Sequence, residues 1–211
     1  MARSTKEEAL VTRARILDAA ERLFQQHGVS RTSLQSIAQA AGVTRGAVYW
    51  HFADKADLFN AMLTRVTLPM QETVNHGAEA RAGDSLEHIR DSLLEALHKT
   101  VDDPQVRRVF EIATHKVEYV DDLTAVRDLH LNLRNKGVAH FERAFRDAMR
   151  RGRFPAGTPT HAAALGLHAL IDGLIQNWML DPEAFDLVKV GRQVLDAFLR
   201  GLARSRSGEP E

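Results

Sequence analysis

The chain contains no cysteine, and it has only six proline and thirteen glycine residues among 211. The absence of cysteine excludes disulfide frameworks, thiolate metal sites and thiol nucleophiles. The most apolar stretch, residues 162–175, is interrupted by His168 and Asp172 and is too short to cross a bilayer. Because residues 3–8 are polar or charged, we expect no signal peptide, no membrane partner and a cytoplasmic location. With 44% hydrophobic residues, the chain can build a sizeable core.

The formal net charge is zero, with 28 basic and 28 acidic residues, which at first argues against a nucleic-acid partner. The charges are not evenly distributed, however. Residues 1–55 contain eight Lys or Arg and five Asp or Glu, whereas residues 56–211 contain 20 and 23. No acidic residue lies between Glu21 and Asp54. An offset of three charges leaves chance and a nucleic-acid partner equally open.

The spacing of the apolar residues is helical almost throughout, and no alternating run is long enough to predict a sheet. The sequence therefore predicts an all-α fold of about nine helices. Thr5 with Glu8, and Thr32 with Gln35, have the spacing of capping boxes at the starts of the first two helices. We expect helices at about 7–27, 33–41, 45–51, 54–76, 85–101, 104–118, 122–151, 160–180 and 184–203.

Residues 32–52 have the pattern of a helix-turn-helix motif, in which two short helices are joined by a tight turn. Gly42 can adopt the positive φ that such a turn requires, and Thr44 can cap the second helix. In this motif the N-terminal end of the second helix enters the major groove of DNA. An ordinary helical hairpin in a bundle is the alternative, but it leaves the acid-free stretch unexplained.

One face of the second helix is suited to DNA contact. Arg45 and Tyr49 are four residues apart, away from the apolar positions Val48 and Phe52, so they can reach a base edge or a phosphate. Gly46 between them permits close backbone approach. Lys55, Thr32 and Ser33 lie at helix starts, where exposed N–H groups favour an anion.

This segment resembles the DNA-binding signature of the TetR family of transcriptional repressors over about residues 10–63. The matching residues are Thr32-x-x-x-x-Ile37-Ala38-x-x-Ala41-Gly42-Val43-x-x-Gly46-x-Val48-Tyr49-x-His51-Phe52-x-x-Lys55-x-x-Leu58. The resemblance implies a three-helix DNA-binding domain at 1–55 and a larger helical domain at 56–211 that binds a small-molecule inducer and dimerises. It also implies that the residues contacting DNA are Thr32, Ser33, Thr44, Arg45, Gly46, Tyr49, His51 and Lys55, with Phe52 as a core anchor.

Two later segments are similar to the multidrug-efflux repressors of this family. They are Glu111-Ile-x-x-His115-Lys116-x-Glu118 and Asp172-Gly-Leu-x-x-x-Trp178. This similarity implies a repressor of an efflux-pump operon that leaves a palindromic operator when it binds a hydrophobic or aromatic molecule. Control of a catabolic or other metabolic operon, and a role as an activator, remain open.

A ligand site can be placed on the helix at 160–180. On a helical wheel, one face is purely apolar, whereas the adjacent face combines His168 and Asp172 with Ile175 and Met179. A mostly apolar surface with a few polar groups is typical of a ligand pocket. Phe110 and Thr114 of the helix at 104–118 are further candidates for the pocket wall. A plain pairing of Asp172 with His168 inside a core or an interface is the alternative.

The last helix, together with the family resemblance, predicts a homodimer; burial of its apolar face within one chain is the alternative. It has an apolar stripe made of Leu187, Val188, Gly191, Val194, Leu195, Phe198 and Leu202. Two symmetric copies of residues 160–203 would form an isologous four-helix interface. Such a dimer would bind an inverted-repeat operator.

An enzyme is the main rival from another class. Glu95-x-x-His98 has the spacing of a di-iron ligand pair, but a di-iron bundle needs a second such pair, which the sequence lacks. There is no Gly-rich phosphate loop either. We therefore expect no catalytic residue, metal or cofactor. A helical interaction module that has lost DNA binding is the other alternative.

Overall fold

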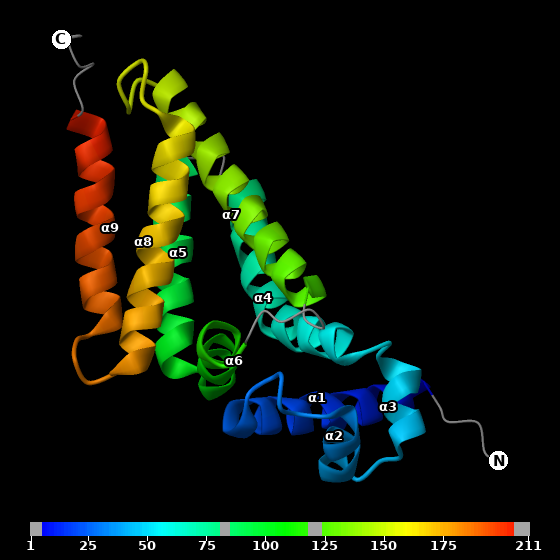
Figure 1. The fold of residues 1–211 in the computed structure, drawn as a ribbon. Coiled ribbons are helices and arrows are strands. Elements are labelled where there is room, and N and C mark those ends of the chain that lie inside the picture. Colours follow the sequence, from blue (N-terminus) through cyan, green and yellow to red (C-terminus); the bar gives the residue numbers. More distant parts are fainter. Residues whose placement is uncertain (1–5, 81–84, 118–123, 205–211) are drawn as a thin grey trace. The chain divides into compact units, whose positions relative to one another are not determined.

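The computed structural model describes residues 6–80, 85–117 and 124–204, and in these ranges every regular element is an α-helix (Figure 1). This confirms the all-α class and the expected helix order. The predicted Thr5–Glu8 capping box lies partly outside the described residues. The helices are α1 (Lys6–His27), α2 (Leu34–Ala41), α3 (Arg45–His51), α4 (Lys55–Ala80), α5 (Ser85–Asp102), α6 (Pro104–His115), α7 (Thr124–Arg150), α8 (Thr160–Leu180) and α9 (Leu187–Arg204). Within the part of the chain that the structure describes, none of these helices could span a membrane.

The helices form two compact units that divide the chain inside α4 and α7. The first unit comprises residues up to Leu68 together with Gln105–His130, and the second comprises Pro69–Pro104 and the residues from Leu131 onward. The first unit therefore contains α6 as well as α1, α2 and α3. The functional boundary that we predict at residue 55 remains a prediction.

In the first unit, large aromatic side chains form the core between the helices. The rings of Phe24 in α1 and Phe59 in α4 are fully buried, with their centroids 6.2 Å apart. Val48 and Phe52, at either end of a turn of helix, are 0% and 2% exposed. This confirms the prediction that Phe52 is a core anchor.

The start of α2 corrects the sequence prediction by one residue. Ser33, not Thr32, is the N-cap, and its hydroxyl accepts a hydrogen bond from the Ser36 backbone N–H at 3.0 Å. Ser36 completes the capping box by accepting from the Ser33 N–H at 3.2 Å, so Gln35 has no part in it. Thr32 is displaced from the cap because its hydroxyl is buried and donates to Gly28 O at 2.8 Å.

The other helix ends agree with the predicted boundaries to within a few residues. The largest shifts are at α4, which continues to Ala80, and at α6 and α9. α9 begins at Leu187 rather than near 184 because the Asp186 carboxylate accepts a hydrogen bond from the Lys189 N–H at 2.9 Å, which caps the helix.

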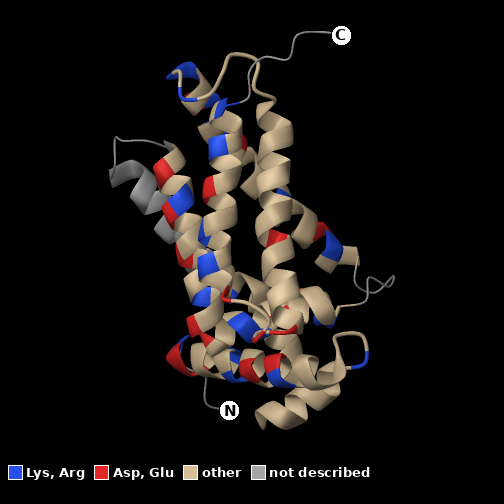
Figure 2. Ribbon diagram, turned by 90° about the vertical axis from the view of Figure 1, so that its left-hand side faces the viewer, with Lys and Arg blue, Asp and Glu red and all other residues tan. Residues whose placement is uncertain are grey.

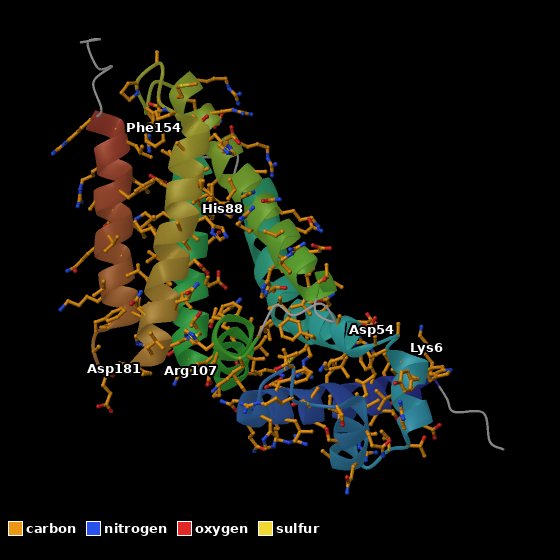
Figure 3. All side chains as sticks on the ribbon, viewed as in Figure 1. Lys6, Asp54, His88, Arg107, Phe154 and Asp181 are labelled. Carbon is orange, nitrogen blue, oxygen red and sulfur yellow. The ribbon has the colours of Figure 1, made fainter. Side chains whose placement is uncertain are left out.

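The second unit is built from α5, α8, α9, the part of α4 from residue 69 onward and the part of α7 from residue 131 onward. Phe154 and Asp181 mark the loops at the two ends of α8 (Figure 3). The buried face of α9 packs against α5 within the same chain, since a Cβ added to Gly191 would clash with Leu97 Cδ1. Part of the apolar stripe that we assigned to a dimer interface is thus already buried, namely Leu187, Gly191 and Leu195.

An ion pair joins the same two helices. Arg90 Nε of α5 donates to Asp196 Oδ1 of α9 at 2.7 Å, and this hydrogen bond lowers the pKa of Asp196 and raises that of Arg90. Lys and Arg residues occur beside Asp and Glu residues on several helices, and other stretches of helix are uncharged (Figure 2). The zero net charge therefore reflects equal numbers of basic and acidic residues, not a lack of charged residues.

Candidate functional site

The turn between α2 and α3 has the conformation that the sequence predicts. Gly42 has φ +64°, in the left-handed region, and its N–H bonds back to the carbonyls of Ala38 and Gln39. Arg15 of α1 fixes this turn from outside, because its Nη2 donates to Ala41 O at 2.7 Å. The end of α2 is thereby held against α1, and the chain reverses at once into α3.

The helix α3 presents a polar and aromatic face to solvent. Thr44 is its N-cap, with the hydroxyl accepting from the Ala47 N–H at 3.1 Å, as predicted. Burial of Val48 and Phe52 orients the helix, so that the side chains on its opposite side are exposed. Tyr49 is 46% exposed and Arg45 is also exposed.

Arg45 and Tyr49 support one another on this face. Arg45 Nη2 donates to the Tyr49 hydroxyl at 3.1 Å, and the guanidinium carbon lies 5.3 Å from the centre of the tyrosine ring. The pair combines a cation with several donors and a phenolic hydroxyl at the N-terminal half of the helix. Such a pair can donate to the O6 and N7 atoms of guanine or to phosphate oxygens.

Trp50 also lies on this surface, although it is not among the predicted DNA contacts. Its side chain is 70% exposed, beside Tyr49, and its ring meets the ring of His51 edge-on at 4.5 Å. A signal was present in the sequence, since Trp50 lies outside the four-residue spacing that buries Val48 and Phe52. An exposed indole can stack on sugars or contact thymine methyl groups.

His51 is half-buried and contributes no positive charge at neutral pH. Burial lowers its pKa, and the nearby Arg13 cation lowers it further. Arg13 itself lies over the Phe52 ring, 5.1 Å from its centre. Towards DNA, His51 can therefore offer a hydrogen bond from a neutral imidazole.

Two of the predicted DNA-contacting residues have internal partners. Lys55 Nζ donates to the backbone carbonyls of Ser30 at 2.9 Å and Thr32 at 3.2 Å, so it fixes the loop between α1 and α2. The Thr32 side chain is only 3% exposed. Its hydroxyl is turned inward and donates to Gly28 O, so a contact of Thr32 with DNA stays a prediction. The remaining predicted contacts, Ser33, Thr44, Arg45, Gly46 and Tyr49, are all exposed.

The predicted ligand-binding residues are divided between the two units. Phe110 and Thr114 lie on α6 in the first unit, where both are half-buried and the Thr114 hydroxyl donates to Phe110 O at 2.7 Å. His168, Asp172 and Ile175 lie on α8 in the second unit.

The α8 residues form the mixed face that the helical wheel predicts. His168 is half-buried beside Gly137 of α7, where a Cβ would lie 3.6 Å from the imidazole Cδ2. Burial lowers the pKa of His168 more than the Asp172 carboxylate raises it, so the ring is neutral at pH 7. Asp172 is exposed and accepts from Gln176 Nε2 at 2.7 Å. Ile175 packs against the core of the unit.

A groove of about 420 Å³ lies elsewhere in the second unit. Its walls include Arg90, Phe154 and Asp196, and none of the predicted ligand-binding residues lines it. Among the described residues, no group of three or more His, Asp or Glu side chains could hold a metal ion. Glu95, the candidate iron ligand, pairs instead with Lys99 at 2.9 Å.

The described residues form a helix-turn-helix motif with a glycine at its turn, and a larger helical part follows it. This combination defines a class of DNA-binding regulators. Residues 16–62 match the sequence profile of bacterial regulatory proteins of the tetR family. Residues 84–203 match the profile of the C-terminal region of MAATS-type transcriptional repressors. The chain belongs to the TetR family of transcriptional regulators.

Individual relatives agree with this assignment. The chain is 40% identical over 199 residues to the transcriptional regulator AcrR of Shigella flexneri, covering 94% of this chain and 93% of AcrR. Its structure is similar to that of NalD, the secondary repressor of the MexAB-OprM multidrug efflux pump in Pseudomonas aeruginosa. The TM-score is 0.86 at 37% identity, covering 95% of this chain and 100% of NalD. The structure is also similar to that of SmeT in a complex with triclosan, with a TM-score of 0.81 at 30% identity. The match covers 95% of this chain and 98% of the SmeT chain. SmeT is the repressor of the Stenotrophomonas maltophilia efflux pump SmeDEF.

Proposed function

We propose that this regulator represses a multidrug efflux pump operon and leaves its operator when it binds a hydrophobic or aromatic molecule. The efflux role is supported by NalD and SmeT, both of which repress efflux pumps. Ligand response is supported by the SmeT–triclosan complex. Because its partner is operator DNA, the regulator acts in the cytoplasm.

The exposed face of α3 is the observation on which DNA recognition rests. Thr44 caps the helix and Val48 anchors it, which leaves Arg45, Tyr49 and Trp50 outward at a fixed orientation. Donors to base edges and an aromatic surface are thus already oriented before DNA arrives. Preorganised groups lose less side-chain entropy on binding.

A homodimer through α8 and α9 would present two such faces to one DNA. Large apolar side chains remain exposed on α8, with Leu165 at 46% and Leu180 at 72%. A Cβ added to Gly173 of α8 would have no neighbour within 4 Å, so another helix has room to approach there. Two symmetric copies would bind an inverted repeat.

Ligand binding would act by favouring a dimer geometry that fits the operator poorly. The candidate ligand contacts are Phe110 and Thr114 in the first unit and, separately, His168, Asp172 and Ile175 in the second unit. The neutral imidazole and the carboxylate would select aromatic ligands with hydroxyl or cationic groups. A ligand shifts the equilibrium only by its different affinities for the two geometries.

Titration of DNA from upstream of the chain's own gene tests the proposal, with Trp50 fluorescence as the signal. Trp178, the second tryptophan, is 4% exposed and gives a constant background. Arg45→Ala should weaken binding by roughly 5- to 150-fold, the worth of a good bidentate base contact of about 1–3 kcal/mol. Arg150→Ala is the matched control, since this arginine is 70% exposed on α7. Equal losses in the two variants would contradict the proposed role of α3.

A further inference from the structure

Glu21 is a buried carboxylate in the C-terminal half of α1, with only 2% of its surface exposed. Burying a charged carboxylate is costly unless it is paired and fully hydrogen-bonded. Glu21 meets this requirement with donors from two other helices. Arg65 of α4 donates from Nη2 to Oε2 at 2.6 Å, and Arg108 of α6 donates from Nη1 to Oε1 at 3.0 Å. Gln105, also of α6, donates to Oε2 at 3.2 Å.

Arg65 also binds a second carboxylate of α1, that of Asp18. Its Nη1 donates to Asp18 Oδ1 at 2.7 Å, and its buried Nε has no hydrogen-bond partner. Asp18 is 51% exposed and receives no bond from α6. The two carboxylates therefore share one arginine, but of these two carboxylates only Glu21 also binds side chains of α6.

Two further polar contacts fasten α6 to the same side of α1. Gln25 Nε2 donates to Glu111 Oε2 at 2.9 Å, and the Val29 N–H donates to Lys116 O at 3.0 Å. Glu21, Gln25 and Val29 follow one another at four-residue spacing, which is one face of a helix extended into the following loop. Figure 1 shows α6 beside the C-terminal end of α1. Directional hydrogen bonds, unlike apolar contacts, fix a particular mutual orientation.

The helix α6 belongs to both parts of the molecule. By sequence it lies inside the C-terminal repressor region at 84–203, yet by its contacts it groups with α1, α2 and α3. The candidate ligand contacts Phe110 and Thr114 lie on this same helix, two and six residues after Arg108. A displacement of α6 therefore acts directly on the buried carboxylate.

We propose that Glu21 is a positioning residue that couples α6 and α4 to the DNA-binding helices. Its carboxylate holds the two arginines in one arrangement, so that α1, and with it the helix-turn-helix, follows α6. Loss of the Glu21 charge leaves the recognition surface intact but uncouples operator affinity from α6. The inference rests on the proposed function, in which a ligand acts on the C-terminal part.

The test compares Glu21→Gln with Asp18→Asn in the full-length chain. Each variant removes one carboxylate from Arg65, but only the first removes the tie to Arg108. Triclosan is the probe, with its binding measured by calorimetry and its effect on operator affinity by DNA titration. We expect triclosan to lower the operator affinity of wild type and Asp18→Asn by the same factor. In Glu21→Gln that factor should fall towards one, although triclosan binds as tightly as before.

Amide hydrogen exchange supplies a readout that needs no ligand. The Val29 amide, which donates to Lys116 O, should exchange at least tenfold faster in Glu21→Gln than in wild type or Asp18→Asn. Arg108→Gln keeps the Glu21–Arg65 pair and should show the same faster exchange of the Val29 amide. This variant therefore tests the coupling if Glu21→Gln fails to fold. If triclosan does not change the operator affinity of the wild type, that result counts against the proposed ligand. The amide exchange rates still test the coupling in that case. The inference would be overturned if Glu21→Gln and Asp18→Asn had the same Val29 exchange rate and the same loss of operator affinity on adding triclosan.

Discussion

Replacing Gly42 by alanine should destabilise the protein, because the turn requires a left-handed residue. Gly42 has φ +64°, and an added Cβ would lie 3.0 Å from Arg15 Nη2. A side chain in the left-handed region costs roughly 1–2 kcal/mol. Displacing Arg15 from Ala41 O would cost up to about 1 kcal/mol more, although its flexible end can partly adapt. We therefore expect a loss of about 1–3 kcal/mol.

Gly46→Ala is the matched control, since both glycines lie in the same short motif. A Cβ at Gly46 would meet only Thr44 Oγ1, at 3.8 Å, and Gly46 has no positive φ. Alanine is favoured over glycine inside a helix by roughly 0.8–1 kcal/mol, so this variant should keep or gain stability. Because Gly46 lies beside Arg45 on the exposed face, its Cβ should instead weaken operator binding.

Urea unfolding at fixed protein concentration measures the first effect, and titration with operator DNA measures the second. Gly42→Ala should lower the unfolding midpoint without changing the slope, whereas Gly46→Ala should leave the midpoint unchanged or raise it. A Gly42→Ala protein as stable as wild type would refute the turn geometry. Equal destabilisation of both variants would refute the distinction between a turn position and a surface position.

Three further predictions concern the second unit. Gly191→Ala should destabilise the fold by about 1–3 kcal/mol in thermal or urea unfolding, because the added Cβ would clash with Leu97 in a filled core. Unchanged stability would mean that α9 does not pack against α5 at this position. Asp196→Asn should be less stable than wild type at neutral pH, and the difference should vanish in acid. The Arg90 hydrogen bond lowers the pKa of Asp196, so its stabilisation is present above an aspartate's ordinary pKa and is lost as the pH falls through the lowered value. A difference that persists at the lowest pH would contradict this. Asp172→Ala should reduce the affinity for a cationic or hydroxyl-bearing aromatic inducer in calorimetry, and unchanged affinity would remove Asp172 from the ligand site.

Much of the fold follows from local sequence signals. The helices and the turn at Gly42 depend on apolar spacing, caps and a positive φ, all of which act over a few residues. The cap of α2 shows the limit of such reasoning. Thr32 and Ser33 are both good caps with a suitable partner three residues later, and only the burial of the Thr32 hydroxyl against Gly28 O decides between them.

The parts of the site that escaped prediction depend on contacts between distant segments. Glu21 reads as an ordinary charge on an amphipathic helix, and its partner Arg108 lies 87 residues away. Lys55 reads as a phosphate ligand, yet its ammonium group bonds to carbonyls 23 and 25 residues earlier. Gly191 reads as part of an apolar stripe for a dimer interface, whereas in the structure the space in front of it is filled by Leu97 of the same chain. Spacing along a helix cannot identify such partners.

The central claim is that the outward face of α3 reads an inverted-repeat operator as part of a dimer. The most direct measurement is a quantitative titration of the full chain on the inverted repeat that footprinting identifies upstream of its own gene, beside the same DNA with one half-site scrambled. We predict two chains per intact repeat, a sharp loss of affinity on scrambling one half-site, and a further loss at high salt as phosphate contacts are screened. Equal affinity for intact and scrambled DNA would contradict the account.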